Sequence, residues 1–187
     1  MKNAKLSKTR RKKLSSLTLL LGLLFLSLFS WELYIRNRPT RLAFASTPQL
    51  EERSEYKEDK TPTVLKIQNA GIELPVIPAS FEGNTWPTTS KGTSFLSSST
   101  LPGDIGNTVI YGHNWSNLLG PLFKVLPGDT IKITTKDGTQ FTYTVQFTQV
   151  VDPTQTYILN NTSDSRLTLY TCTGFLDTKR FVVTAFL

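Results

Sequence analysis

The stretch from Leu14 to Trp31 constrains this chain of 187 residues most strongly, because it contains no charged residue and is rich in leucine and phenylalanine. Only Glu32 interrupts its continuation to Ile35, and a segment of this length can cross a bilayer as a tilted helix. Seven lysines and arginines, and no acidic residue, precede it in residues 1–13. Because basic residues favour the cytoplasmic side, the sequence predicts a basic cytoplasmic tail over residues 1–13 and a transmembrane signal anchor over residues 14–35.

A cleaved signal peptide is the alternative to an anchor. The tripeptide Ala43-Phe44-Ala45, followed by Ser46, has the small-x-small pattern of a cleavage site. It lies well beyond the apolar stretch, with three arginines in between, and this distance favours an anchor that is not cleaved. In both cases we expect the rest of the chain to be extracellular, and with the anchor retained we expect the protein in the cell membrane.

The formal net charge of +7 belongs largely to the membrane segment. Ten of the 21 lysines and arginines lie in residues 1–41, where Glu32 is the only acidic residue. The remainder carries eleven basic and thirteen acidic residues, so its charge gives no support for a nucleic-acid partner. No spacing in it is typical of a metal site, and we predict neither a metal nor a cofactor.

The composition changes twice after the anchor. Residues 36–62 are polar and charged, which predicts a juxtamembrane linker with at most a short surface helix. Residues 63–187 are enough for one compact domain. Their short apolar and β-branched runs, separated by turn residues, predict an all-β sheet that closes into a barrel or a sandwich. The predicted strands are 64–67, 72–77, 107–112, 129–135, 140–151, 166–171 and 179–186, and residues 81–106 are predicted to be mostly loop, with a short helix near Phe95.

Cys172, the only cysteine, follows the predicted strand 166–171 directly. If this strand pairs as a hairpin with strand 179–186, Arg180 becomes its neighbour at one rim of the sheet. A nearby cation favours the reactive thiolate, and a guanidinium can also donate hydrogen bonds to an oxyanion. Taken alone, the pair favours the alternative of an inert buried cysteine and a solvated arginine at a strand end, because free cysteines are often inert core residues.

His113, the only histidine, directly follows the predicted strand 107–112. A cysteine nucleophile needs a base or a cationic partner at neutral pH, and a histidine can provide either. Taken alone, a single histidine is also compatible with a surface position or a satisfied core position.

Four motifs together resemble the sortase family, the membrane-anchored cysteine transpeptidases of the bacterial surface. Thr168-Leu169-Tyr170-Thr171-Cys172 matches the Thr-Leu-x-Thr-Cys pattern, and Arg180 stands where the family has its active-site arginine. The segment Gly106–His113 resembles the Gly-Asn…Gly-His strand, and Leu126–Ile131 resembles the Leu-x-x-Gly-Asp-x-Ile strand entry. The resemblance covers residues 63–187. It implies a closed eight-stranded sortase-type β-barrel with one or two short helices.

The resemblance also implies the chemistry. Cys172 attacks a carbonyl in a Leu-Pro-x-Thr-Gly-like sorting motif near the C-terminus of a secreted protein substrate, His113 protonates the departing amine, and Arg180 stabilises the oxyanion. An amine of a cell-wall precursor or of a pilin lysine then resolves the thioacyl-enzyme. The loop over residues 152–166 is implied to form a wall of the substrate groove. The implied substrate-binding residues are Thr171, Val151, Pro153, Tyr157 and Ile158, although an ordinary surface loop is equally compatible with these residues.

Two other functions share the same residues. A cysteine peptidase of this fold would transfer the acyl group to water, and only analysis of the products separates it from a transpeptidase. An inert, membrane-anchored β-domain that binds a peptide is the third hypothesis. The presence of both Cys172 and His113 argues against it.

Overall fold

The computed structural model describes residues 8–36, 42–45, 58–80 and 86–187. The chain divides into two compact units, Met1–Arg38 and Pro39–Leu187. Parts of three predicted segments lie outside the described residues: 1–7 of the basic tail, 37–41 and 46–57 of the linker, and 81–85 of the loop.

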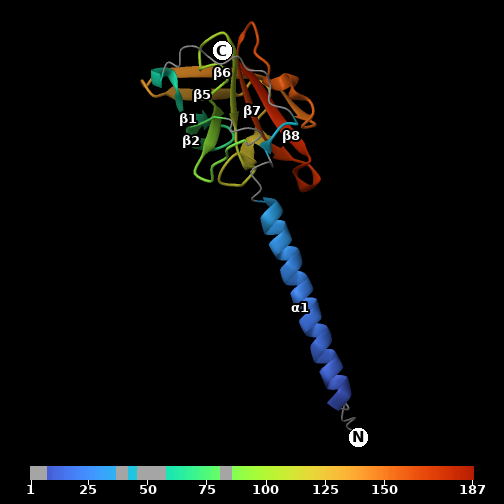
Figure 1. The fold of residues 1–187 in the computed structure, drawn as a ribbon. Coiled ribbons are helices and arrows are strands. Elements are labelled where there is room, and N and C mark those ends of the chain that lie inside the picture. Colours follow the sequence, from blue (N-terminus) through green and yellow to red (C-terminus); the bar gives the residue numbers. More distant parts are fainter. Residues whose placement is uncertain (1–7, 37–41, 46–57, 81–85) are drawn as a thin grey trace. The chain divides into compact units, whose positions relative to one another are not determined.

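The first unit contains helix α1, Lys8–Arg36 (Figure 1). Its section Ser15–Tyr34 has a mean hydropathy of 1.8, and its side chains are exposed. Within the described residues, α1 is the one helix that is long and apolar enough to cross a membrane. This confirms the predicted helix at the position of the anchor.

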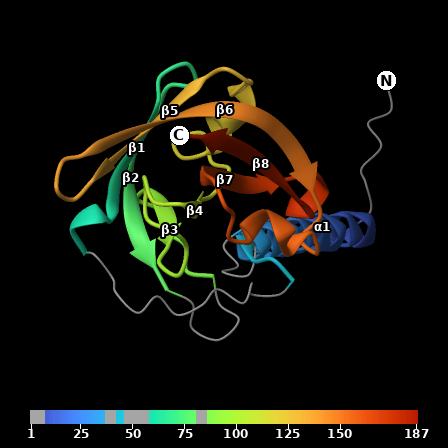
Figure 2. The same cartoon turned by 90° about the horizontal axis from the view of Figure 1, so that it is seen from above.

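The second unit is a closed barrel of eight strands, as predicted (Figures 1 and 2). Around the barrel the strands follow the order β1-β2-β3-β4-β7-β8-β6-β5. The pairs β2–β3 and β4–β7 are parallel, and the other six are antiparallel. The strands are β1 Pro62–Ile67, β2 Ile72–Ala79, β3 Thr93–Leu96, β4 Gly106–Tyr111, β5 Thr130–Thr135, β6 Gln140–Val151, β7 Ser165–Thr173 and β8 Lys179–Phe186. Short 3-10 helices span Glu58–Lys60 (η2), Gly120–Lys124 (η3), Thr156–Leu159 (η4) and Phe175–Asp177 (η5).

Two hairpins join strands that the sequence predicts. The turn after Ile67 joins β1 to β2, and Asp137-Gly138 joins β5 to β6. Gly138 has φ +84°, and the Asp137 carboxylate accepts a hydrogen bond from the Thr139 N–H at 3.0 Å. An Asp-Gly turn adopts this geometry readily, because glycine tolerates positive φ and aspartate bonds to its own turn.

The short helix predicted near Phe95 is wrong, because these residues form β3. Phe95 pairs with Pro78 of β2 on one side and with Ile110 of β4 on the other. All four residues of β3 are buried. Backbone pairing on two sides and burial of a β-branched and aromatic segment stabilise a strand here, and neither is visible in the local sequence.

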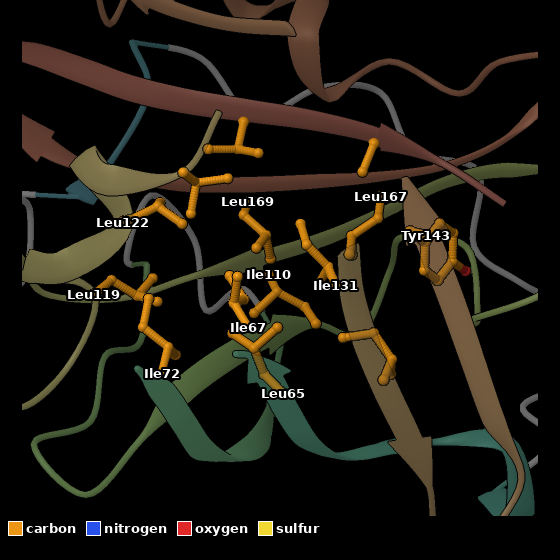
Figure 3. Packing of buried hydrophobic residues seen from close by; sticks show 14 of the residues in the cluster. Leu65, Ile67, Ile72, Ile110, Leu119, Leu122, Ile131, Tyr143, Leu167 and Leu169 are labelled. Atoms are coloured by element: carbon orange, nitrogen blue, oxygen red, sulfur yellow. The ribbon is translucent and has the colours of Figure 1, made fainter. Parts of the chain in front are cut away.

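The side chains of β4, β7 and β8 alternate between two hydrophobic clusters. The inner cluster fills the barrel and is mostly aliphatic (Figure 3). In Figure 3, Ile110, Leu167 and Leu169 project into this interior together with Leu65, Ile67 and Ile131 from β1 and β5. The outer cluster covers the opposite face of β4 and β7 and contains Cys172. The alternation therefore separates the interior of the barrel from the face that carries the candidate site.

Candidate functional site

Cys172 and Arg180 are direct partners across the β7–β8 hairpin. The loop between them contains η5, and Gly174 at its start has φ +79°. Cys172 is 1% exposed and Arg180 is 3% exposed, so both are covered in this structure. The predicted hairpin thus places the thiol beside the guanidinium.

The parallel pairing of β4 with β7 relates the position of His113 to that of Cys172. Tyr111 pairs with Tyr170, and the Gly112 N–H donates a hydrogen bond to the Tyr170 carbonyl at 3.3 Å. His113 is two residues beyond Tyr111, just as Cys172 is two residues beyond Tyr170. His113 therefore follows the end of β4, which pairs with β7, the strand that carries Cys172 next to Arg180 of β8.

The His113 ring stacks on the Trp115 ring, with centroids 4.5 Å apart and planes 8° apart. His113 is 7% exposed, and Trp115 is partly buried. A flat stack of this kind fixes the plane of the imidazole without using either of its nitrogen atoms. A residue that orients His113 was not predicted from the sequence, although Trp115 stands only two residues after the histidine.

Thr171 connects the strand of the cysteine to the strand of the histidine. Its hydroxyl donates a hydrogen bond of 2.7 Å to the Gly112 carbonyl, and the side chain is fully buried. This bond stabilises the register between β7 and β4 directly beside Cys172 and His113. A substrate-binding role for Thr171 stays a prediction.

The guanidinium of Arg180 is held by backbone carbonyls. Nη1 donates to the carbonyls of Asp177 and Lys179 at 2.9 Å each, and Nη2 donates to the Ala43 carbonyl at 2.7 Å. Nε is buried and has no hydrogen-bond partner among the residues that the structure describes. The Nε–H of Arg180 therefore stays available, in a fixed orientation, to bind a further oxygen atom.

The β7–β8 loop contains the only non-glycine residues of the described chain with positive φ, Leu176 at 53° and Asp177 at 59°. Such angles cost free energy for residues with a side chain, and they persist where the surroundings fix them. The Asp177 carbonyl accepts from Arg180, and its carboxylate accepts from the Asn114 side chain at 3.3 Å. The strained loop thereby connects Arg180 to the residue after His113.

Aromatic rings form much of the outer cluster around Cys172. The rings of Tyr111 and Tyr170 stack at 5.3 Å, and Trp86 meets Tyr111 edge-on at 5.4 Å. Burial raises the pKa of both phenols well above the ordinary value for tyrosine. Both phenols therefore stay neutral near physiological pH, and each donates its proton, Tyr111 to the Pro87 carbonyl and Tyr170 to the Leu42 carbonyl.

Several residues predicted to bind substrate lie in or beside this cluster. Val151, the partner of Arg180 on β6, and Ile158 of η4 belong to it. Pro153 contributes its carbonyl, which accepts from the Ala45 N–H at 2.8 Å. Tyr157 is 57% exposed and is not a member of the cluster. Substrate binding by these four residues stays a prediction, but three of them border the surface that carries Cys172.

The wall formed by η4 is fixed by Asn107 of β4. The side-chain Nδ2 of Asn107 donates to the backbone carbonyls of Ile158 and Asn160. Its side-chain Oδ1 accepts from the Thr168 hydroxyl at 2.8 Å. Among the described residues, no group of three His, Cys, Asp or Glu side chains could hold a metal ion.

The fold and the site together define a β-barrel domain with a cysteine and an arginine paired on adjacent strands and a histidine two residues beyond the end of a third strand. The Sortase domain family model matches residues 65–187. Sortase A of Listeria monocytogenes serovar 1/2a is 32% identical over 131 residues, an alignment that spans 68% of this chain and 56% of that protein. The chain belongs to the sortase family.

Solved structures agree with this assignment. The structure of Listeria monocytogenes sortase A is 30% identical, with a TM-score of 0.56 over 69% of this chain and 88% of that one. Sortase A of Corynebacterium diphtheriae is 27% identical, with a TM-score of 0.56 over 67% and 60% of the two chains. A Clostridium perfringens sortase D5 transpeptidase is 26% identical, with a TM-score of 0.56 over 71% and 82%.

Proposed function

We propose that this protein is a sortase-type cysteine transpeptidase that joins secreted proteins to an amine at the cell surface. The observation that carries the proposal is the register of the three strands, which pairs Cys172 with Arg180 and pairs Tyr111, two residues before His113, with Tyr170, two residues before Cys172. Membership of the family supports the same reaction class. The substrate is a secreted protein with an LPxTG-like sorting motif, and the acceptor is an amine of a cell-wall precursor or of a pilin lysine.

The first half-reaction forms a thioester. The Cys172 thiolate attacks the scissile carbonyl carbon, and the negative charge moves to the carbonyl oxygen. Collapse of this tetrahedral intermediate breaks the carbon–nitrogen bond, and the His113 imidazolium gives its proton to the departing amine. The neutral imidazole that remains accepts a proton from the incoming amine, which attacks the thioester and expels the thiolate.

Arg180 serves as the donor to the oxyanion. Its Nε is buried and aligned by the carbonyl contacts of Nη1, so little reorganisation is required when the charge develops. A fixed donor in a site that excludes water stabilises an oxyanion far more than the same donor in water. Arginine also keeps its charge throughout the cycle, because it does not deprotonate in proteins.

The decisive experiment uses the full chain in detergent micelles with a fluorogenic LPxTG peptide. We expect a thioacyl adduct on Cys172 by mass spectrometry and a transpeptidation product when a glycine or lysine amine is added. The Cys172→Ala variant is the matched control and should yield neither. Hydrolysis at the same rate with and without the amine would favour the peptidase alternative, and the absence of any adduct would favour the inert peptide-binding domain.

We propose a single-pass topology with the N-terminus in the cytoplasm and the catalytic domain outside. The apolar section of α1 and the lysines and arginines in residues 1–13 support it. Protease added to intact cells should remove the barrel domain and leave a short membrane-bound fragment. Full protection of the domain would contradict this orientation.

A further inference from the structure

Asp177 is a buried acidic residue next to an exposed loop tip. Within η5, Phe175 is 85% exposed and Leu176 is 59% exposed, whereas Asp177 is 9% exposed. The backbone of Asp177 has φ +59°, an angle that costs free energy for a residue with a side chain, and burial of a carboxylate costs more. Both costs require compensating contacts from the surroundings of this residue.

Asp177 contacts the two elements that carry Arg180 and His113. Its backbone carbonyl accepts a hydrogen bond from Arg180 Nη1 at 2.9 Å, and its N–H donates to the Gly174 carbonyl at 3.1 Å. Its carboxylate Oδ1 accepts from Nδ2 of Asn114 at 3.3 Å, and Asn114 directly follows His113. The main chain of Asp177 thus holds the guanidinium, while its side chain reaches the segment of the histidine.

Strand pairing ends before it reaches His113. The last residue pair between β4 and β7 joins Tyr111 to Tyr170, and His113 comes two residues later. The hydrogen bond between Asn114 and Asp177 joins residues 63 positions apart, and it ties the connection after β4 to the β7–β8 loop. This bond therefore restrains the chain beside His113 at a point where the β-ladder no longer does.

We propose that Asp177 is a positioning residue, whose carboxylate holds His113 in a fixed place relative to Arg180 through the hydrogen bond to Asn114. The proton donor and the oxyanion donor of the reaction then stay aligned with Cys172. The hydrogen bond acts through geometry and not through charge, so an amide at position 177 can replace the carboxylate. This inference rests on the proposed function only in taking His113 and Arg180 as the reacting groups.

The first measurement is cleavage of the fluorogenic LPxTG peptide by the full chain in detergent micelles. Asp177→Gly removes the carboxylate at a position where glycine adopts the backbone angle without strain. We expect kcat to fall about tenfold, the effect of one hydrogen bond to a charged group, with less than about a twofold change in KM. Asp177→Asn keeps an oxygen that can accept from Asn114 and should recover most of the rate.

Leu176→Gly is the matched control for the change to glycine. Leu176 has φ +53° and is 59% exposed, so glycine relieves the same kind of strain there without removing a buried contact. This variant should keep the parental kcat. Equal losses of kcat in Leu176→Gly and Asp177→Gly would overturn the proposal, because mobility of the loop alone would then explain both.

Asn114→Ala breaks the same hydrogen bond from the other side, and kcat should fall to the same extent. The double variant Asn114→Ala/Asp177→Gly should lose no more than either single variant, because the two residues act through one bond. Asn117→Ala is the control for this change, since Asn117 is exposed in the same connection between β4 and η3, and it should keep the parental rate. Additive losses in the double variant would contradict a shared bond and overturn the proposal.

The second measurement does not depend on activity. His113 is the only histidine, so in a chain produced without a histidine tag one NMR resonance, that of its Cε1 proton, reports on this ring. The ring current of Trp115, on which His113 stacks, shifts the resonance upfield in the parent. We expect it to move toward its position in the unfolded chain in Asp177→Gly and Asn114→Ala, and to stay in place in Asp177→Asn and Leu176→Gly.

The two measurements separate this inference from the proposed function. If the resonance moves as expected but the parent forms no thioacyl adduct, the transpeptidase is refuted while the positioning of His113 stands. If the resonance stays in place in Asp177→Gly, Asp177 does not position the histidine, whatever happens to kcat. Loss of the packed barrel in both Asp177→Gly and Asn114→Ala, seen by near-UV circular dichroism, also overturns the inference, because the bond would then support the fold and not the site.

Discussion

The two faces of β4, β7 and β8 differ in composition although they alternate residue by residue. The inner face presents mainly aliphatic side chains, Ile110, Leu167, Leu169, Val183 and Ala185, with the partly buried ring of Phe181 packed against them. The outer face presents aromatic rings, threonine, the thiol and the guanidinium on the same strands. Aliphatic side chains pack an interior tightly without polar atoms to satisfy, whereas the outer face combines burial with hydrogen-bonding groups.

This contrast suggests that the two faces have different roles. The inner face should determine whether the barrel folds, and the outer face should determine whether a folded barrel reacts. Substitutions on the two faces can therefore be compared on one free-energy scale, as losses of stability or as losses of transition-state stabilisation.

The largest expected effect is that of Cys172→Ala on the outer face. Acyl transfer should be abolished, because no nucleophile remains, while the barrel should stay folded after the loss of one sulfur atom. Mass spectrometry for the thioacyl adduct and a thermal melt provide the two measurements. If the variant unfolds or still forms an adduct, the idea that the outer face determines reactivity and the inner face determines folding is contradicted.

Arg180→Lys should lower kcat by roughly a hundredfold to a thousandfold, the usual cost of removing one oxyanion donor. Lysine keeps the charge but loses the planar set of donors that binds the loop carbonyls and leaves Nε available. Initial rates of peptide cleavage over a range of peptide concentrations give kcat and KM. If the lysine variant turns over like the parent while Arg180→Ala does not, Arg180 acts through its charge alone.

Leu169→Ala tests the inner face. Leu169 is fully buried in the barrel, and loss of such a side chain costs roughly 2–5 kcal/mol of unfolding free energy. Denaturant titration should show this loss, while kcat per folded molecule should equal that of the parent. A reduced kcat in the folded fraction would show that packing inside the barrel also controls the reaction.

Trp115→Ala should lower kcat by about fivefold, because an aromatic stack contributes about 1 kcal/mol to holding the His113 ring in place. KM should change little, since Trp115 contacts the histidine and is not part of the outer cluster. Trp115→Phe retains a stacking ring and should recover most of the rate. Equal losses in both variants would assign Trp115 a role other than stacking.

The sequence predicted those features that depend on local chemistry. Alternation and turn residues located both hairpins, and the positions of Cys172, His113 and Arg180 at strand ends followed from the same pattern. The sequence did not predict β3, which depends on pairing with strands on both sides. Nor did it predict the burial of Leu42 and Phe44, because the Arg180–Ala43 hydrogen bond joins residues 137 positions apart. Contacts at such a distance leave no periodicity in a single sequence.

Tyr170→Phe should have the smallest effect, and it should appear mainly at alkaline pH. At neutral pH the variant loses one bond of 3.3 Å to Leu42, which should cost about 1 kcal/mol or less.

Burial raises the pKa of Tyr170 in the folded barrel, so its phenol stays protonated when the unfolded chain has begun to ionise. The parent is therefore fully stabilised below the ordinary tyrosine pKa of about 10 and loses stability as the pH rises from there toward the folded pKa. The Tyr170→Phe variant lacks this titrating phenol. As the pH rises, its free energy of unfolding should therefore fall less steeply than that of the parent, by up to about 1.4 kcal/mol per pH unit. Denaturant titrations from pH 8 to pH 11 measure both slopes. Identical slopes would show that the outer face opens to water around Tyr170 at high pH, and that its burial differs in kind from the burial of the aliphatic inner face.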